Sequence, residues 1–495
     1  MRRSNSWRLL TGWLIGIIGI MFLVTTAFAQ ERTEEKPLPS QPNKVEEEIE
    51  RFRALIQRQQ QQLEQQQRQL DEQAALLRQL QQQLVERQPA LAPVQNERHK
   101  SEEAPKTPAQ QRPSGEDRLQ AGWADGHPFI RSGDGELEAR FTGYTQLDFR
   151  GYGAGNTPPN TFAIRRARLA VEGTLFRHYE FKLEGDFADT ASTMLREGFI
   201  NINYAPEVQF RFGQFKAPFS QEELISSSSI DFVERSMVNN LVHSYTPGMQ
   251  FHGKVADGRI EYQLAAVNGK GILATNTSST SEGVVRLRFN PWKQTDHFWL
   301  RGLKFGGALS DGRTSNGRSF RGRTESRSFV FFEPAPINGE VLRANGELTW
   351  LLGPGAIRAE YVQTNQARDG LGPGRINLPG VVAKGYMIQG TYLLTGESKP
   401  ESGLVKPKSV FAGRGDEPGT GAWELKFRYA NLQLSDSFLS NRAETFSAGI
   451  NWYLTPYVRY MLDLNVERFK DPLRSPMPQN PGALFTWLTR VQFYF

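Results

Sequence analysis

The chain has 495 residues, of which 38% are hydrophobic and 23% are charged, and its formal net charge is +6. It contains no cysteine, so disulfides, thiolate metal sites and a cysteine nucleophile are excluded. The basic residues are spread along the chain and form no single patch, which argues against nucleic acid as a partner. The length allows more than one folded unit.

Residues 1–29 have the pattern of a signal peptide. Arginines precede a long apolar run, and small residues at Ala27 and Ala29 mark a cleavage site before Gln30. A membrane anchor is the alternative, because the apolar run approaches the ~18 to 20 residues that a spanning helix requires. The charged, glutamine-rich sequence that follows favours cleavage and export.

Residues 44–88 repeat every seven positions. Isoleucine or leucine occupies the d positions of this heptad, at Ile49, Ile56, Leu63, Leu70, Leu77 and Leu84. The a positions are apolar at both ends of the repeat and glutamine in its middle, which weakens the core but can fix the register of parallel helices. The pattern predicts a periplasmic coiled coil, and a parallel trimer would suit a trimeric barrel. The alternative is a disordered glutamine-rich tract.

Residues 89–130 separate the heptads from the rest of the chain. They are rich in proline, glutamine and charged residues, which favours an extended linker. We therefore expect four parts in order: a signal peptide, a coiled coil, this linker, and a last domain over residues 136–495.

From residue 136 onward the hydrophobic period is two, which indicates β-strands. In one segment three charged side chains alternate with three apolar ones, namely Arg166, Arg168 and Glu172 with Leu169, Val171 and Leu175. A soluble sandwich seldom buries three charges, whereas a transmembrane barrel meets lipid on its outer face and water on its inner face. The alternation therefore predicts an outer-membrane barrel.

Tight turns divide the alternating segments, and longer polar connections lie between them. The turns are predicted near Phe176, Pro206, Gly258, Pro354 and Pro456. With short turns in the periplasm and long loops outside, the spacing gives an all-β fold: a roughly 16-stranded antiparallel transmembrane β-barrel, preceded by the α-helical coiled coil. The aromatic last strand fits this fold. Residues 396–420 do not, because they are too long for the periplasmic turn that the count requires.

Five stretches carry a resemblance to a known family. They are RRARLAVEGTLF from Arg165, VQFRFGQFKAPFSQEELISSSSIDFVERS from Val208, YQLAAVNGKG from Tyr262, GAWELKFRYANLQL from Gly421 and AGINWYLTPYVRYMLDLNVERF from Ala448. Through them the chain resembles the phosphate-selective porins O and P. The resemblance implies a homotrimer of barrels, passive transport of anions such as phosphate or pyrophosphate, and a third loop, between GQFKAPF and FVERS, that folds into the barrel and narrows the pore.

The candidate pore-lining and anion-binding residues are basic side chains on the inward faces of the strands. Arg166, Arg168 and Lys216 come first, because their motifs match the family, and the others are Arg211, Arg286, Arg288 and Arg428. Arginine suits phosphate or carboxylate, since its guanidinium stays charged and presents a planar fork of donors. Permeation also requires binding that is weak enough for release. The alternative is that these charges only solvate the wall.

Two further groups of charges affect the expected selectivity. Five arginines between Asp311 and Gly339 are expected in a loop outside the barrel, where they could collect anions or contact lipopolysaccharide. Inward acids such as Glu222, Glu234 and Glu424 are expected to pair with much of the basic wall. Alternative functions are therefore a weakly selective general porin and a structural outer-membrane anchor tethered through the coiled coil.

Sequence signals of catalysis are lacking. His243 is the single histidine beside a serine, Ser244, and no motif supplies an acidic partner. There is no HExxH motif and no Gly-rich phosphate loop. We therefore expect no enzyme activity, no catalytic or metal site and no cofactor. The expected partners are small inorganic or organic anions, with outer-membrane lipid and lipopolysaccharide around the barrel.

Overall fold

The computed structural model describes residues 119–495, apart from 125, 154–157, 189–193, 277–279, 412–418, 436–439 and 471–482. Ala109–Phe495 forms one compact unit. The predicted signal peptide and coiled coil lie outside the described residues. Within them, no helix is both long enough and apolar enough to span a membrane.

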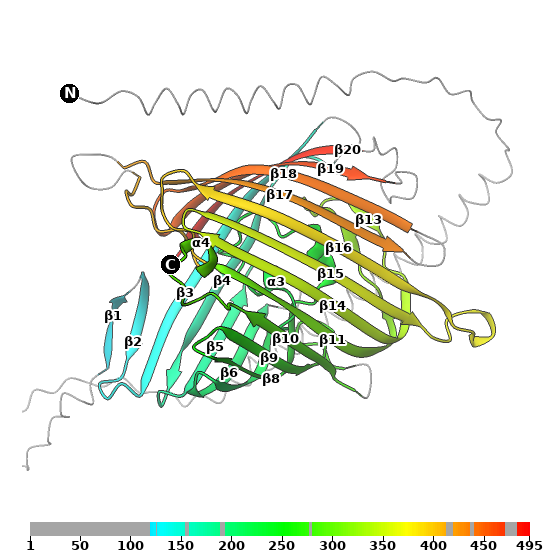
Figure 1. The fold of residues 1–495 in the computed structure, drawn as a ribbon, viewed down its shortest axis with the longest axis horizontal. Helices are drawn as coiled ribbons and strands as arrows, with labels where there is room; N and C mark the ends of the chain where they lie inside the picture. The colour runs from blue at the N-terminus through cyan, green and yellow to red at the C-terminus, as the bar shows by residue number, and fades with distance from the viewer. Residues whose placement is uncertain are drawn as a thin grey trace, which may run out of the picture. The chain divides into compact units, whose positions relative to one another are not determined.

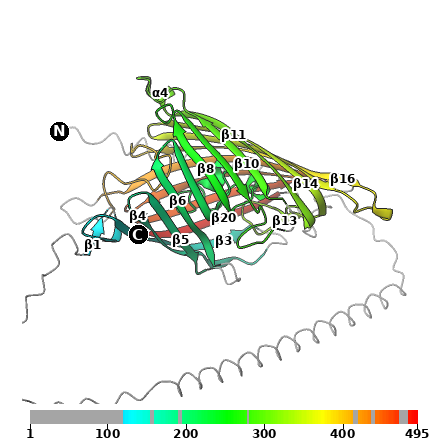
Figure 2. The same ribbon diagram turned by 90° about the horizontal axis from the view of Figure 1, so that it is seen from below.

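Sixteen strands of the described residues form one closed antiparallel barrel. Each strand pairs with its neighbour in the chain, and β20 pairs with β3 to close the ring (Figures 1 and 2). The strands are β3 (Leu137–Tyr152), β4 (Thr161–Leu175), β5 (Tyr179–Asp186), β6 (Leu195–Ala205), β7 (Val208–Lys216), β8 (Tyr245–Val255), β9 (Ile260–Val267), β10 (Glu282–Phe289), β11 (Leu303–Arg318), β14 (Pro336–Leu352), β15 (Gly355–Arg368), β16 (Leu378–Leu393), β17 (Ala422–Ser435), β18 (Ser440–Tyr453), β19 (Val458–Phe469) and β20 (Ala483–Tyr494). This confirms the predicted fold class.

Two faces with opposite chemistry explain why these segments form a barrel. Apolar side chains point outward, as shown by Leu183 and Phe427, which are 57% and 55% exposed in the isolated chain. Their charged neighbours Glu184 and Lys426 are buried in the interior. Closure pairs the backbone of both edge strands, which a sheet in lipid requires because no water can satisfy free amides there.

The two ends of the barrel differ in the length of their connections. The predicted tight turns lie together at one end, and two of their residues, Phe176 and Arg177, adopt positive φ angles of 48° and 64°. The chain enters β3 and leaves β20 at this same end, which is the periplasmic end in barrels of this type. A short helix, α4 (Phe298–Arg301), lies in the connection between β10 and β11.

A hairpin precedes the barrel. It consists of β1 (Gln120–Ala124) and β2 (His127–Arg131), and β2 also pairs with the start of β3. The prediction of an extended linker over residues 89–130 is therefore wrong for its last part, where β1 and β2 form. Backbone pairing with the edge of β3 gives this polar segment a structure that its composition alone did not indicate.

Candidate functional site

The connection between β7 and β8, residues 217–244, folds back into the barrel and is called the inward loop here. Its apolar side chains are almost fully buried, among them Phe219, Phe232, Val233, Met237 and Leu241. A short helix, α3 (Gln221–Leu224), begins after Ser220, whose hydroxyl accepts a hydrogen bond from the backbone amide of Glu223 at 3.2 Å. A 3-10 turn, η2 (Met237–Leu241), packs against β15, β16 and β17 on the far wall. The loop thus crosses the lumen, as the family resemblance implied.

Residues 319–335, the second inward loop, also enter the lumen between β11 and β14. They contain the small hairpin of β12 (Gly322–Arg323) and β13 (Val330–Phe332). Phe329 and Phe331 belong to the same hydrophobic cluster as Leu241 of the inward loop. The expectation that this arginine-rich loop lies outside the barrel is therefore wrong. Burial of its aromatic run against the inward loop outweighs the preference of its arginines for water.

A third segment enters from the periplasmic end. Residues 394–411, the periplasmic segment, pack Leu404 and Val405 against Leu393, Ala422 and Tyr453 of the barrel wall. This burial explains why the connection between β16 and β17 is longer than a turn.

The inward loop separates the far wall from a cavity of about 460 Å³, which we call the arginine chamber. Two acids line it, Asp186 and Glu223. Its lining also includes six arginines, contributed by β4, β6 and the two inward loops: Arg165, Arg166, Arg168, Arg196, Arg235 and Arg327.

Two β-bulges place arginines in this chamber. On β4, Gln146 pairs with Arg166 and Leu147 pairs with Ile164, so that Arg165 is the extra residue. On β6 the register shifts in the same way, and Arg196 is the extra residue. A bulge redirects the side chain of the inserted residue and reverses the alternation beyond it. Both arginines therefore line the lumen although strict alternation would not place them there.

One carboxylate, Glu234 of the inward loop, is surrounded by four arginines. Its oxygens lie 2.5 Å from Arg165, 2.9 Å from Arg150, 3.8 Å from Arg490 and 3.9 Å from Arg166. Burial acts to raise the pKa of Glu234, but the arginines dominate and hold that pKa well below its usual range. Asp148 is a second carboxylate in this group, 2.6 Å from Arg490 and 3.7 Å from Arg150. Two negative charges among four guanidinium groups leave this side of the lumen positive.

Arg168 lies where the arginine chamber meets a narrower cavity of about 180 Å³, because it lines both. Its guanidinium is 2.9 Å from Asp186 and 2.9 Å from Glu184, and it donates a hydrogen bond to the Tyr245 hydroxyl at 2.7 Å. It also lies between the rings of Tyr144 and Tyr245, 5.8 and 5.7 Å from their centres. These contacts fix the arginine in one orientation where the two cavities meet.

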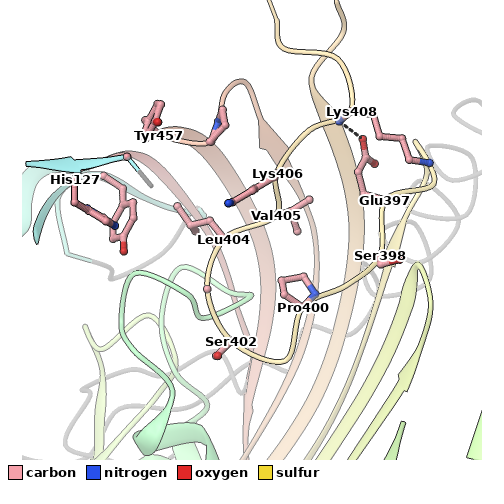
Figure 3. A pocket seen from close by; sticks show the side chains of 14 residues that line it. His127, Glu397, Ser398, Pro400, Ser402, Leu404, Val405, Lys406, Lys408 and Tyr457 are labelled. Carbon is pink, nitrogen blue, oxygen red and sulfur yellow. Dashed lines mark hydrogen bonds between the residues drawn. The ribbon is translucent and has the colours of Figure 1, made fainter. Parts of the chain in front are cut away.

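Tyr494 lines the narrow cavity and also a wider cavity of about 910 Å³ near the periplasmic end. The periplasmic segment forms much of the wall of this wider cavity, which we call the exit cavity. Figure 3 shows Lys406 and Leu404 of that segment facing His127, with Tyr457 nearby. Through the side chains that they share, the three cavities form a row from the loop end of the barrel to its periplasmic end.

Comparison with known proteins identifies the family. The phosphate-selective porin O and P family matches residues 140–471 of the chain. The chain belongs to this family. Porin O of Pseudomonas aeruginosa is 22% identical to this porin over 415 residues, which cover 74% of the chain and 90% of Porin O. An uncharacterized protein of Aquifex aeolicus is 25% identical over 240 residues, 44% of the chain and 54% of that protein.

Two of the solved structures that resemble this porin are an anion-selective porin and an outer membrane channel. The anion-selective porin from Comamonas acidovorans matches with a TM-score of 0.48 and 12% identity, covering 73% of the chain and 100% of that structure. The outer membrane channel DcaP of Acinetobacter baumannii matches with a TM-score of 0.48 and 9% identity, covering 73% and 98%. Membership of the porin O and P family makes this chain an outer-membrane channel protein and not an enzyme.

The seven predicted site residues lie in different surroundings. Arg166 and Arg168 line the arginine chamber. Lys216 instead donates hydrogen bonds to the backbone carbonyls of Glu223 and Ile225, at 2.6 and 3.0 Å, and so fastens the inward loop. Arg211 is half-buried over the ring of Phe199, and its Nε has no hydrogen-bond partner among the described residues.

The other three predicted arginines of the porin are paired with acids. Arg286 lies 2.6 Å from Glu347, Arg288 contacts Glu401, and Arg428 contacts Glu325. These acids come from β14, from the periplasmic segment and from the second inward loop. Because they are distant in the sequence, no local pattern predicted which acid pairs with which arginine. Their pairing leaves less free positive charge on this wall than the arginines alone suggested.

Four chamber arginines were not among the predicted residues of the porin. Arg165 and Arg196 depend on bulges, and Arg235 and Arg327 lie on the inward loops. Arg235 belongs to the FVERS motif, which was the available sequence signal for it.

Proposed function

We propose that this porin conducts small anions, such as phosphate or pyrophosphate, by passive diffusion through the arginine chamber. The observation that carries the proposal is the lining of that chamber, in which six arginines face two acids. Fixed positive charge in a cavity with low-dielectric walls raises the local concentration of anions. Conduction also requires release, and neighbouring acids such as Asp186 and Glu223 weaken the hold on an anion.

The chamber is large enough for an anion that keeps part of its water. One water takes about 30 Å³ of the liquid, so a cavity of about 460 Å³ accommodates several waters beside a phosphate. Partial hydration limits the binding free energy, which favours passage over tight capture.

A weakly selective general porin is the second candidate. It is favoured by the ion pairs of Arg286, Arg288 and Arg428, which neutralise the wall away from the chamber. A structural anchor is the third candidate, and it depends on the predicted coiled coil at residues 44–88.

The proposal includes the assembly and surroundings of the porin. A homotrimer, contact with lipid and lipopolysaccharide, cleavage after residue 29 and a periplasmic coiled coil remain predictions. Mass measurement of the full protein and of a variant without residues 30–120 would test whether the coiled coil is what holds a trimer together.

Single-channel recording in planar bilayers tests the proposed function. In a KCl gradient we expect a reversal potential on the anion side, and we expect added phosphate to block the chloride current. Arg165→Gln should weaken both effects, whereas Arg177→Gln, on an exposed periplasmic turn, should leave them unchanged. Discrete steps without anion preference would leave the general porin, and the absence of any conductance would favour the anchor.

A further inference from the structure

The periplasmic segment reaches the inward loop through one lysine. Nζ of Lys399 lies 2.6 Å from Oδ1 of Asp231 on the inward loop and 2.5 Å from Oε1 of Glu424 on β17. All three side chains are buried. Burial acts to lower the pKa of Lys399, but the two carboxylates dominate and raise that pKa above its ordinary value, so the lysine stays charged.

Asp231 is one of several residues that tie the inward loop to the far wall, where the backbone amides of Glu222 and Val233 also donate hydrogen bonds to carboxylates. Its carboxylate also lies 2.5 Å from Arg358 and accepts a hydrogen bond from Gln389 at 3.1 Å. Its backbone carbonyl accepts hydrogen bonds from Lys426 and Asn451, both at 2.9 Å. Lys399 is the member of this group that does not belong to the barrel wall, so it joins the periplasmic segment to the inward loop.

The periplasmic segment is itself held firmly enough to act as a support. Glu401 forms ion pairs with Arg288 and Lys304, and its carbonyl accepts a hydrogen bond from Arg358 at 2.9 Å. The apolar contacts of Leu404 and Val405 fix the next residues against the wall. Because these contacts fix the residues that follow Lys399, the lysine has little freedom to move together with Asp231.

We propose that Lys399 is a positioning residue for permeation, which holds the inward loop against the far wall from the periplasmic side and so confines solutes to the arginine chamber. The proposal rests on the anion conduction proposed above. The inward loop supplies one wall of the chamber through Glu223, Ser227 and Arg235. If its tip were released, the lumen would open beside the far wall, and anions and cations alike could bypass the arginines.

Lys399→Gln tests this, because glutamine keeps hydrogen-bonding capacity but loses the charge. We expect a larger single-channel conductance and a reversal potential that moves toward zero. Lys399→Arg should keep the properties of the unaltered protein. Lys293→Gln is the matched control, since it removes a lysine charge from a periplasmic turn outside the lumen.

A second measurement reports on the loop itself. The chain contains no cysteine, so Ser227→Cys introduces a unique thiol on the inward loop, where Ser227 is only 2% exposed. We expect a small thiol reagent to label it about tenfold faster or more when Lys399→Gln is also present, because labelling follows local opening. A merely structural role of Lys399 elsewhere in the barrel would not change this rate.

The outcomes separate the two proposals. An anion-selective protein whose selectivity and labelling rate are both unaffected by Lys399→Gln overturns the positioning role and leaves the proposed function standing. A protein without anion selectivity overturns the proposed function, while the labelling rate still decides whether Lys399 holds the loop. If Lys399→Gln does not fold, the charge-balanced variant Lys399→Gln/Glu424→Gln replaces it, with the same expected changes and the same contrary result.

Discussion

Replacing Arg166 by glutamine should weaken anion binding without disturbing the barrel. Arg166 donates a hydrogen bond to Gln146 at 2.8 Å, and it lies 3.9 Å from the carboxylate of Glu234. Glu234 keeps its closer contacts with Arg165 and Arg150 when Arg166 is lost. The substitution therefore removes a positive charge from the chamber and leaves no acid without a partner.

The size of the effect follows from Coulomb's law. For an anion about 6 Å from the guanidinium, one unit of charge contributes about 0.7 kcal/mol at the dielectric constant of water and about 2.8 kcal/mol at an effective value of about 20. These free energies correspond to a loss of roughly 3-fold to 100-fold in affinity per unit of anion charge. The half-blocking concentration of phosphate on the chloride current measures this loss. A value equal to that of the Arg177→Gln control would refute the reasoning that Arg166 faces the permeating anion.

Three other perturbations have defined outcomes. Arg168→Gln removes the nearest basic partner of Asp186 and Glu184, although Arg196 and Lys182 stay within 3.7 and 3.2 Å of these acids. We therefore expect a loss of about 1–3 kcal/mol in the free energy of unfolding, measured by denaturant titration, and a shift of the reversal potential toward cation preference. Burial acts to raise the pKa of Glu401, but Arg288 and Lys304 dominate and lower that pKa to about 2. The ion pairs of Glu401 therefore stabilise the folded protein fully above pH 4.5, the ordinary pKa of a glutamate. This stabilisation is lost as the pH falls from 4.5 to about 2. The contribution of Glu401 to the free energy of unfolding, measured as the difference between the porin and its Glu401→Gln variant, should accordingly stay constant from neutral pH to about pH 5 and fall below pH 4.5. A difference that already falls near pH 6 would contradict this assignment. Phe331→Ala opens a cavity under the second inward loop and should cost about 3–5 kcal/mol in the same titration, whereas Arg321→Ala, on an exposed part of that loop, should cost less than about 1 kcal/mol.

The barrel was predictable because its signal is local and repeated. Apolar and polar side chains alternate within each strand, as Leu183 and Glu184 do. This alternation assigns the outer and inner face of a strand without knowledge of distant residues. The tight turns were predictable for a similar reason, since turn residues define them within a few positions.

The candidate site was predictable only in part, because its geometry depends on insertions and distant partners. Arg166 and Arg168 were found by alternation, but Arg165 was missed because one bulged residue reverses the alternation. The exposed apolar residues of β4 do change from even positions, Phe162 and Ile164, to an odd position, Leu169, and this change was the available sequence signal for the bulge. The inward position of Phe331 likewise depends on the inward loop, which lies far away in the sequence.

The ion pairs of the lumen affect how the selectivity of this pore can change. Arg286 and Arg288 both face Glu347, at 2.6 and 3.8 Å. Loss of that one carboxylate would leave the guanidinium of Arg286 without an acidic partner among the described residues, whereas Arg288 would keep its ion pair with Glu401. A pore built in this way gains anion preference by losing an acid, so new selectivity requires no new basic residue and a single codon change is enough.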